Sequence, residues 1–249
     1  MKHITSSVAF VPVRKEASHR SEMVSQLLFG ETAQILKTEK EWLFIRTSFD
    51  DYAGWIESDA VIELADNDGN GKRNILSEPL TAVQLNGHSL WLPGGSEVIA
   101  QSNSNKFKWA GKSYTLQRNT ASEKKSDLIQ TALKYLHAPY LWGGRTVLGI
   151  DCSGFTQIVC KIHGIALPRD AGDQVKTGKE IPQSAMEKGD LVFFENENSK
   201  ITHVGFYYGD NRILHASKKV RIDRLDEKGI FNEESERYTH NYHSVRRIK

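Results

Sequence analysis

The stretch PYLWGGRTVLGIDCSGF, residues 139–155, decides how the C-terminal half of the chain is interpreted. Its first part is rich in turn-forming residues, and a helix is predicted directly after it, over residues 152–163. The apolar residues that recur there at helical spacing are Phe155, Ile158, Val159 and Ile162. Gly164 is expected to end the helix, and Cys152 stands at its start.

This position predicts a reactive thiol. A cysteine at a helix N-terminus meets the positive end of the helix dipole, which favours the thiolate and lowers the pKa. The first-turn N–H groups have no intrahelical partners, so they are suited to stabilise a developing oxyanion. A buried structural cysteine is the commoner alternative, and Cys160 in the middle of the helix fits it. The rise between the two is roughly 12 Å, too far for a disulfide, so Cys152 is expected to be free.

A nucleophilic cysteine needs a base, and the base needs an orienting group. His203 and His215 are candidates, because they fall on two predicted strands, 203–209 and 211–217, joined by a turn. A polar surface position is the alternative for a lone strand histidine. The other histidines are interpreted as surface or packing residues: His3, His19, His88, His137, His163, His240 and His243.

The register of this hairpin decides whether the two histidines can meet. If Tyr208 pairs with Arg212, then Gly205 faces His215 and His203 lies diagonally from His215 on the same face. A shift of one residue would place the two histidines on opposite faces. The first register is the one that catalysis requires.

Three domains are predicted. Residues 1–66 hold short β-type runs such as VAFVPV (8–13), and they are expected to form a small barrel. Residues 67–120 resume short strands but are few for an independent core. In residues 121–249, helices are followed by strands, which indicates an α+β domain.

Composition excludes several classes of function. The 33 basic and 31 acidic residues nearly balance, so a nucleic-acid partner is not expected. No apolar run reaches the roughly 18 residues of a membrane span, and the start MKHITSSVAFVPVRKE lacks a secretory apolar region. A cytoplasmic monomer is therefore expected. No CxxC or close histidine pair is present, so neither a metal nor a cofactor is expected.

Four blocks in order carry a family resemblance: PYLWGGRTVLGIDCSGF, GIALPRDAGDQ, EKGDLVFF and THVGFYYGDNRILHAS. Over residues 121–220 the chain resembles the NlpC-type cell-wall cysteine peptidases. The resemblance implies a papain-like α+β fold, with a nucleophile helix packed on an antiparallel sheet. It also implies Cys152 as nucleophile, His203 as general base, His215 as the residue that orients His203, and Tyr140 close to the thiol.

The N-terminal part refines this resemblance. WLFIRTSFDDYAGWIES (42–58) resembles bacterial SH3-like barrels, and residues 67–120 resemble them weakly. The combination is similar to the dipeptidyl-peptidase VI type, which releases L-Ala-γ-D-Glu from murein peptides with a free L-Ala amine. It implies a role in cell-wall recycling. The residues implied to contact the amine end of the substrate are Asp151, Ser153, Glu22 and Tyr52.

Two alternatives stay open. The thiol chemistry would equally serve an acyl transferase or an amidase that acts on another amide. A non-catalytic murein-binding protein is the second alternative, because SH3-like modules often bind. The choice between lysine and diaminopimelate at the third position of the substrate is also open.

Overall fold

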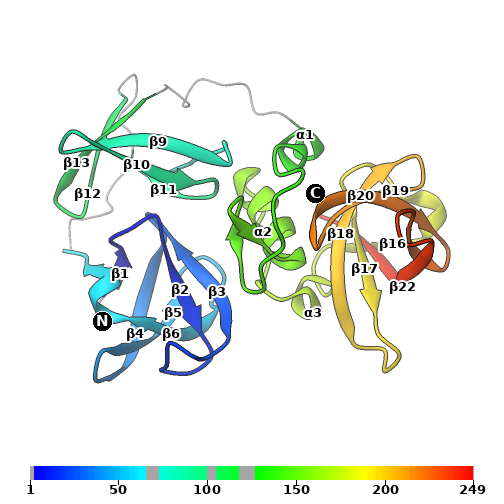
Figure 1. The fold of residues 1–249 in the computed structure, drawn as a ribbon, viewed down its shortest axis with the longest axis horizontal. Helices are drawn as coiled ribbons and strands as arrows, with labels where there is room; N and C mark the ends of the chain where they lie inside the picture. Colours follow the sequence, from blue (N-terminus) through cyan, green and yellow to red (C-terminus); the bar gives the residue numbers. More distant parts are fainter. Residues whose placement is uncertain (1–2, 66–72, 100–104, 118–126, 249) are drawn as a thin grey trace. The chain divides into compact units, whose positions relative to one another are not determined.

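The computed structural model describes residues 3–65, 73–99, 105–117 and 127–248. The chain divides into two compact units, Met1–Lys125 and Ser126–Lys249 (Figure 1). The domain boundaries predicted at residues 66/67 and 120/121 lie outside the described residues. Among the described residues, no helix is long and apolar enough to cross a membrane.

The first unit begins with a seven-stranded antiparallel sheet in the order β3-β2-β6-β5-β4-β1-β7. Its elements are β1 (His3–Ser6), β2 (Phe10–Arg14), β3 (Met23–Leu28), β4 (Thr32–Glu39), β5 (Trp42–Thr47), β6 (Ala53–Glu57), the 3₁₀ turn η1 (Ser58–Ala60) and β7 (Val61–Glu63). In β2, Val11 and Val13 are buried while their neighbours are partly exposed, which is the period-two pattern of a half-buried strand. They pack with Leu27, Ile45 and Ile56 in one apolar core.

Two smaller sheets complete this unit. They have the orders β10-β9-β13-β12 and β11-β8. The strands are β8 (Asn74–Ile75), β9 (Leu80–Leu85), β10 (His88–Pro93), β11 (Glu97–Val98), β12 (Lys106–Trp109) and β13 (Lys112–Leu116).

The core of the smaller sheets depends on the larger one. Phe29, which follows β3, packs edge to face against the stacked rings of Phe107 and Tyr114 in the smaller sheets. The backbone N–H of Glu97 donates to the Phe29 carbonyl at 3.0 Å. The next residue, Gly30, has φ +79°, and a Cβ there would lie 1.8 Å from the Glu97 carbonyl oxygen, so only glycine fits. The two parts of the first unit therefore share a core.

The described part of the second unit holds three α-helices, a two-stranded sheet made of β14 and β15, and a seven-stranded sheet. The helices are α1 (Leu128–Leu133), α2 (Cys152–Ile162) and α3 (Ala171–Gln174), and the 3₁₀ turn η3 spans Gln183–Ala185. The strands are β14 (Arg145–Thr146), β15 (Gly149–Ile150), β16 (Lys179–Ile181), β17 (Leu191–Glu195), β18 (Ile201–Gly209), β19 (Arg212–Ser217), β20 (Lys219–Asp226), β21 (Gly229–Asn232) and β22 (Arg237–Arg247). The sheet order is β16-β22-β17-β18-β19-β20-β21, and β21 also pairs with β22, so the sheet closes on itself. The C-terminal residues thus supply the last strand, β22, between β16 and β17.

Helix α2 lies against β18 and β19 (Figure 1). Its residues are all buried, and Phe155 contacts Phe206 of β18 edge to face, with ring centroids 5.6 Å apart. The helix ends in a Schellman motif: Ile165 N–H donates to the Cys160 carbonyl and Gly164 N–H to the Lys161 carbonyl, both at 2.9 Å. Gly164 has φ +78°, which explains why glycine stops the helix where the sequence predicts.

Candidate active site

The N-terminus of α2 positions Cys152 through Asp151. The Asp151 carboxylate caps the helix, accepting from Gly154 N–H at 2.7 Å, and it also accepts from Gly143 N–H at 2.8 Å. A Cβ on Gly154 would lie 2.3 Å from the Gly144 carbonyl oxygen, so the turn and the helix start touch backbone to backbone. This close approach explains why residue 154 is a glycine.

A buried ion pair holds this cap. Arg169 contacts both oxygens of Asp151, at 2.5 and 3.0 Å, and donates to Ser153 Oγ at 2.9 Å. Both members of the pair are almost completely buried. Arg169 lies in the block GIALPRDAGDQ but was not predicted as a site residue. The predicted contact of Asp151 with a substrate amine stays a prediction, and in this structure its oxygens are used by Arg169 and two backbone N–H groups.

The Cys152 thiol lies beside the strand that carries His203. The backbone N–H groups of Val204 and Ser153 lie close enough to the sulfur to lower its pKa. Burial, and then the charge of Asp151, raise the Cys152 pKa to about 12, against the lowering by these N–H groups and by Arg169. The lowered pKa predicted from the helix terminus is therefore wrong, because burial and the neighbouring carboxylate outweigh the groups that lower the pKa. The resting thiol is protonated and needs a base.

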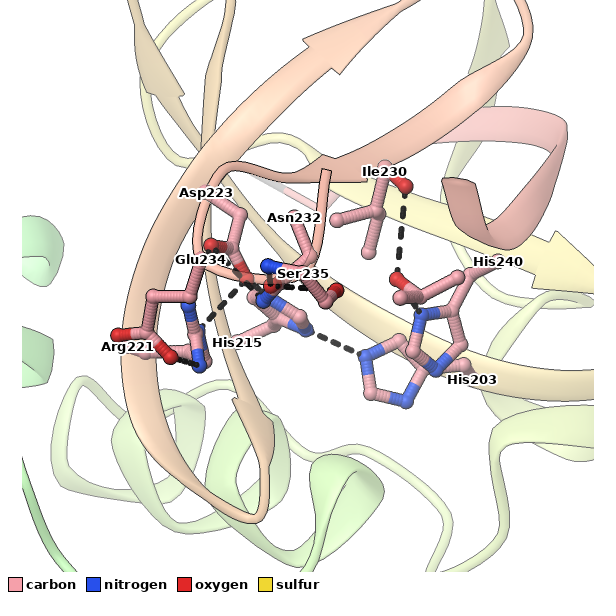
Figure 2. Close-up of polar contacts among 10 residues, drawn as sticks. His203, His215, Arg221, Asp223, Ile230, Asn232, Glu234, Ser235 and His240 are labelled. Atoms are coloured by element: carbon pink, nitrogen blue, oxygen red, sulfur yellow. Dashed lines mark hydrogen bonds and ion pairs between the residues drawn. The ribbon is translucent and has the colours of Figure 1, made fainter. Parts of the chain in front are cut away.

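The side chains of His203 and His215 are in contact on one face of the sheet, as in the first of the two predicted registers. Gly205 pairs with His215, which confirms that part of the predicted register. The pairing of Tyr208 with Arg212 is wrong, because a bulge lets Gly209 pair with Arg212. His203 Nε2 lies 2.8 Å from His215 Nδ1 (Figure 2). Because Nε2 is engaged, Nδ1 is the nitrogen of His203 that is left to act as a base.

A carboxylate extends this pair. His215 Nε2 lies 3.0 Å from Asp223 Oδ2, and Asp223 is buried on β20 (Figure 2). Burial raises the Asp223 pKa, but hydrogen bonds from His215 and Arg221 outweigh it and leave the pKa lowered. Burial, followed by the charges of His240 and His215, holds the His203 pKa well below its ordinary value. Asp223 was not predicted as a site residue from the sequence, because it follows the last of the four blocks that carry the family resemblance.

His240 stacks on His203. Their ring centroids are 4.0 Å apart with an interplanar angle of 28°, and Figure 2 shows the two rings side by side. Burial, and then the charge of His215, lower the His240 pKa to about 4. The sequence predicted only a surface or packing residue here. Strand β22 returns beside β17 and brings His240 to the site, and no local motif signals that return.

Tyr140 lies near the thiol, where the resemblance placed it. Its backbone N–H donates to the Lys218 carbonyl at 2.9 Å. Burial, and then the charges of Cys152 and Asp151, raise the Tyr140 pKa, so the phenol stays protonated and is able to donate a hydrogen bond.

Glu22 and Tyr52 belong to the other compact unit. Glu22 precedes β3 on the surface and lies 3.6 Å from Lys15 Nζ, and the Tyr52 N–H donates to Thr47 Oγ1 at 3.0 Å. Their predicted contact with the substrate stays a prediction.

A polar hollow of about 400 Å³ opens beside His240. It is lined by Glu195, Asn196, Glu197, Asn198, Thr202, Thr239, His240 and Asn241. His240, which lines the hollow, also stacks on His203. Amide, hydroxyl and carboxylate groups around it suit a polar ligand.

A thiol at a helix start, beside a strand that carries an imidazole held by a second imidazole, is the arrangement that nucleophilic catalysis through a thioester requires. The NlpC/P60 family model matches residues 137–239, and the bacterial dipeptidyl-peptidase SH3 domain model matches residues 13–61. The chain belongs to the NlpC/P60 family.

Relatives and a solved structure agree with this assignment. A γ-D-glutamyl-L-lysine dipeptidyl-peptidase of Bacillus subtilis is 33% identical over 224 residues, 78% of this chain and 72% of the relative. A protein of the same name from Bacillus cereus is 34% identical over 160 residues, 62% of this chain, and the match covers 46% of that relative. The crystal structure of an NlpC/P60 family protein from Bacillus cereus has the same fold, with a TM-score of 0.85 at 19% identity and 99% coverage of both chains.

Proposed function

We propose that the chain hydrolyses the amide bond between γ-D-Glu and the L-diamino acid of murein peptides that carry a free N-terminal L-Ala. The observation that carries this proposal is the position of Cys152 at the start of α2, which packs against β18, the strand that holds His203 beside its partner His215. The names of the Bacillus relatives, γ-D-glutamyl-L-lysine dipeptidyl-peptidase, support the choice of bond.

The reaction begins from a neutral thiol and a neutral imidazole, because burial raises the pKa of Cys152 and lowers that of His203. As the sulfur attacks the γ-carbonyl carbon, the thiol proton passes to His203 Nδ1. We assign stabilisation of the oxyanion to the Cys152 N–H at the start of α2 and to the Tyr140 hydroxyl, because Gly154 N–H already donates to Asp151. The amine leaves with the proton from His203, and a thioester of L-Ala-γ-D-Glu remains on Cys152. Water, deprotonated by His203, then releases the dipeptide and regenerates the thiol.

We assign recognition of the free amine to Glu22, with the hydroxyls of Tyr52 and Ser153 as further contacts. Asp151 contributes from the helix cap, where Arg169 already neutralises its charge. A carboxylate pairs with an ammonium group but not with a neutral amide, so a blocked L-Ala is excluded. This selectivity suits fragments that other enzymes have already cut, and we therefore place the reaction in cytoplasmic recycling of cell-wall peptides.

We further propose that the catalytic unit is papain-like, with α2 as the nucleophile helix on the antiparallel sheet. The described part of the predicted domain 67–120, residues 73–99 and 105–117, belongs in this proposal to a second SH3-like barrel. The antiparallel order β10-β9-β13-β12 and the shared core around Phe107 support it. The dependence on Phe29 of the larger sheet explains how so few residues are stable.

Three substrates test the proposal: free L-Ala-γ-D-Glu-L-Lys, the same tripeptide N-acetylated, and intact sacculi. We expect only the free tripeptide to release L-Ala-γ-D-Glu, measured by mass spectrometry. The tripeptide with diaminopimelate at the third position resolves the choice of diamino acid. Equal cleavage of the acetylated peptide would contradict recognition of the amine.

Glu22→Gln isolates the amine contact. We expect KM for the free tripeptide to rise by roughly tenfold or more, because a charge-assisted contact worth about 1.5–3 kcal/mol is lost. Glu41→Gln, an exposed glutamate of the same unit, is the matched control. Unchanged KM in Glu22→Gln would remove Glu22 from the site.

A further inference from the structure

The hydrogen-bonded pair of His203 and His215 continues to a third side chain. Strands β19 and β20 pair His215 with Arg221, so Asp223, two residues on, lies on the same face of the sheet. Its Oδ2 lies 3.0 Å from His215 Nε2, and the whole arrangement is buried (Figure 2). A buried carboxylate that contacts an imidazole constrains which nitrogen of the ring carries the proton.

Every described side-chain contact of the Asp223 carboxylate is with a nitrogen that carries hydrogen-bond donors or is able to donate. Arg221 Nη2 donates to Oδ1 at 2.9 Å, and Asn232 Nδ2 lies 3.5 Å from the same oxygen. Arg221 Nε lies 2.8 Å from Oδ2, and Glu234 holds the guanidinium from its other side at 3.1 Å. These contacts keep Asp223 as an anion that only accepts. His215 Nε2 must therefore be the donor to Oδ2.

We propose that Asp223 is a positioning residue that sets the proton acceptor of the catalytic base through His215. With the proton on His215 Nε2, His215 Nδ1 is an acceptor, and His203 must donate to it from Nε2. His203 Nδ1 then carries the lone pair that receives the thiol proton. Without the anion, the opposite tautomers are equally allowed, and His203 Nδ1–H would face the thiol as a donor. This inference rests on the proposed function, in which His203 is the base.

The number of protons on Cys152, His203, His215 and Asp223 together stays the same when the thiol transfers its proton. When the thiol transfers its proton, His203 becomes an imidazolium with protons on both nitrogens. Its Nε2–H continues to donate to His215, and His215 continues to donate to the Asp223 carboxylate. No proton leaves the chain, and the negative charge of Asp223 stabilises the imidazolium. The amine leaving group then takes the proton from His203 Nδ1.

Asp223→Asn is the informative variant. Arg221 Nη2 and Asn232 Nδ2 both donate to Oδ1, whereas Arg221 Nε, although 2.8 Å from Oδ2, makes no hydrogen bond to it. The amide oxygen of the new asparagine is therefore held at the Oδ1 position. Its NH₂ group then faces His215 Nε2 as a donor and forces the proton onto His215 Nδ1. His203 is driven to the tautomer that cannot accept the thiol proton. We expect kcat to fall by roughly 10²- to 10⁴-fold with KM nearly unchanged, the size seen when a serine-protease triad is locked in the wrong tautomer.

Asp226→Asn is the matched control. Asp226 lies on the same strand and accepts from the Tyr238 hydroxyl at 2.7 Å, so the substitution makes the same chemical change outside the His203–His215 chain. We expect its kcat to stay within about twofold of the parent value, because its contacts are exposed. A kcat for Asp223→Asn equal to that of this control would overturn the proposal.

The tautomers are read directly from ¹⁵N chemical shifts of histidine-labelled protein, without any substrate. We expect the parent protein to carry protons on Nε2 of both His203 and His215, and Asp223→Asn to carry them on Nδ1. A parent protein with His215 protonated on Nδ1 overturns the proposal even if the variant does not fold. Loss of kcat with unchanged tautomers overturns it too, since the loss would then be structural. Correct tautomers in a protein that leaves the tripeptide intact would instead refute the proposed function alone.

Discussion

His240 makes the stability of the catalytic unit depend on pH. Its pKa falls from an ordinary value of 6.5 to about 4, with burial as the largest cause. The unfolded chain therefore binds a proton to this residue as soon as the pH drops below 6.5, whereas the folded chain does so only near pH 4. Protons stabilise the unfolded state within that window, so the free energy of unfolding decreases as the pH falls.

The magnitude follows from the two pKa values. Above pH 6.5 the residue is neutral in both states and contributes nothing. At pH 5 the linkage relation gives a loss of about 2 kcal/mol, and at pH 4 about 3 kcal/mol. His203 and His215 shift in the same direction, so the wild-type loss exceeds the share of His240.

His240→Gln removes this share because glutamine does not titrate. Cys160 is completely buried and, in a Cys152→Ala background, is the only thiol of the chain. Urea unfolding at about pH 7 and pH 5, read by dithiodipyridine labelling of Cys160, therefore reports on the catalytic unit. Between pH 7 and pH 5 the free energy of unfolding should decrease by about 2 kcal/mol less in the variant than in its parent.

For each protein, the measured quantity is the change in the free energy of unfolding between the two pH values. Any pH-independent cost of the substitution, such as lost stacking on His203, cancels in this change. His243→Gln on the same strand, where the side chain is 36% exposed, controls for the removal of a histidine from β22. Equal losses in His240→Gln and its parent would refute the reasoning, because His240 would then titrate alike in both states.

Three further substitutions test the packing that holds the site. Arg169→Gln leaves the Asp151 charge buried without its ion-pair partner, and we expect a loss of about 3–5 kcal/mol in urea unfolding, against little change if the pair is dispensable. Phe155→Ala opens a cavity between α2 and β18 and is expected to cost about 3–5 kcal/mol in the same assay; a cost below about 1 kcal/mol would mean that the helix repacks. Gly205→Ala places a Cβ 2.7 Å from that of His215, so kcat for the tripeptide should fall while far-UV circular dichroism is retained; an unchanged kcat would show that His215 need not hold its position.

The parts of the site that the sequence predicts are the local ones. The helix at Cys152 follows from apolar spacing and a terminal glycine, and the meeting of His203 with His215 follows from the register of one hairpin. Both depend on residues close together in the chain. The SH3-like character of the N-terminal part rests on short strands and turns, which are also local.

The parts that the sequence does not predict depend on return paths of the chain. Arg169 reaches Asp151 from 18 residues away, and His240 reaches His203 only because β22 returns beside β17. Asp223 depends on the pairing of β20 with β19. The pKa of Cys152 depends on burial and on the Asp151 charge, neither of which a helix-start position reveals.

The central claim is that Cys152 is the nucleophile. The most direct measurement is turnover of free L-Ala-γ-D-Glu-L-Lys by Cys152→Ala beside Cys160→Ala, which removes the other thiol from the same helix. We predict no detectable L-Ala-γ-D-Glu from the first variant and near wild-type release per folded molecule from the second. Release of the dipeptide by Cys152→Ala would contradict the account.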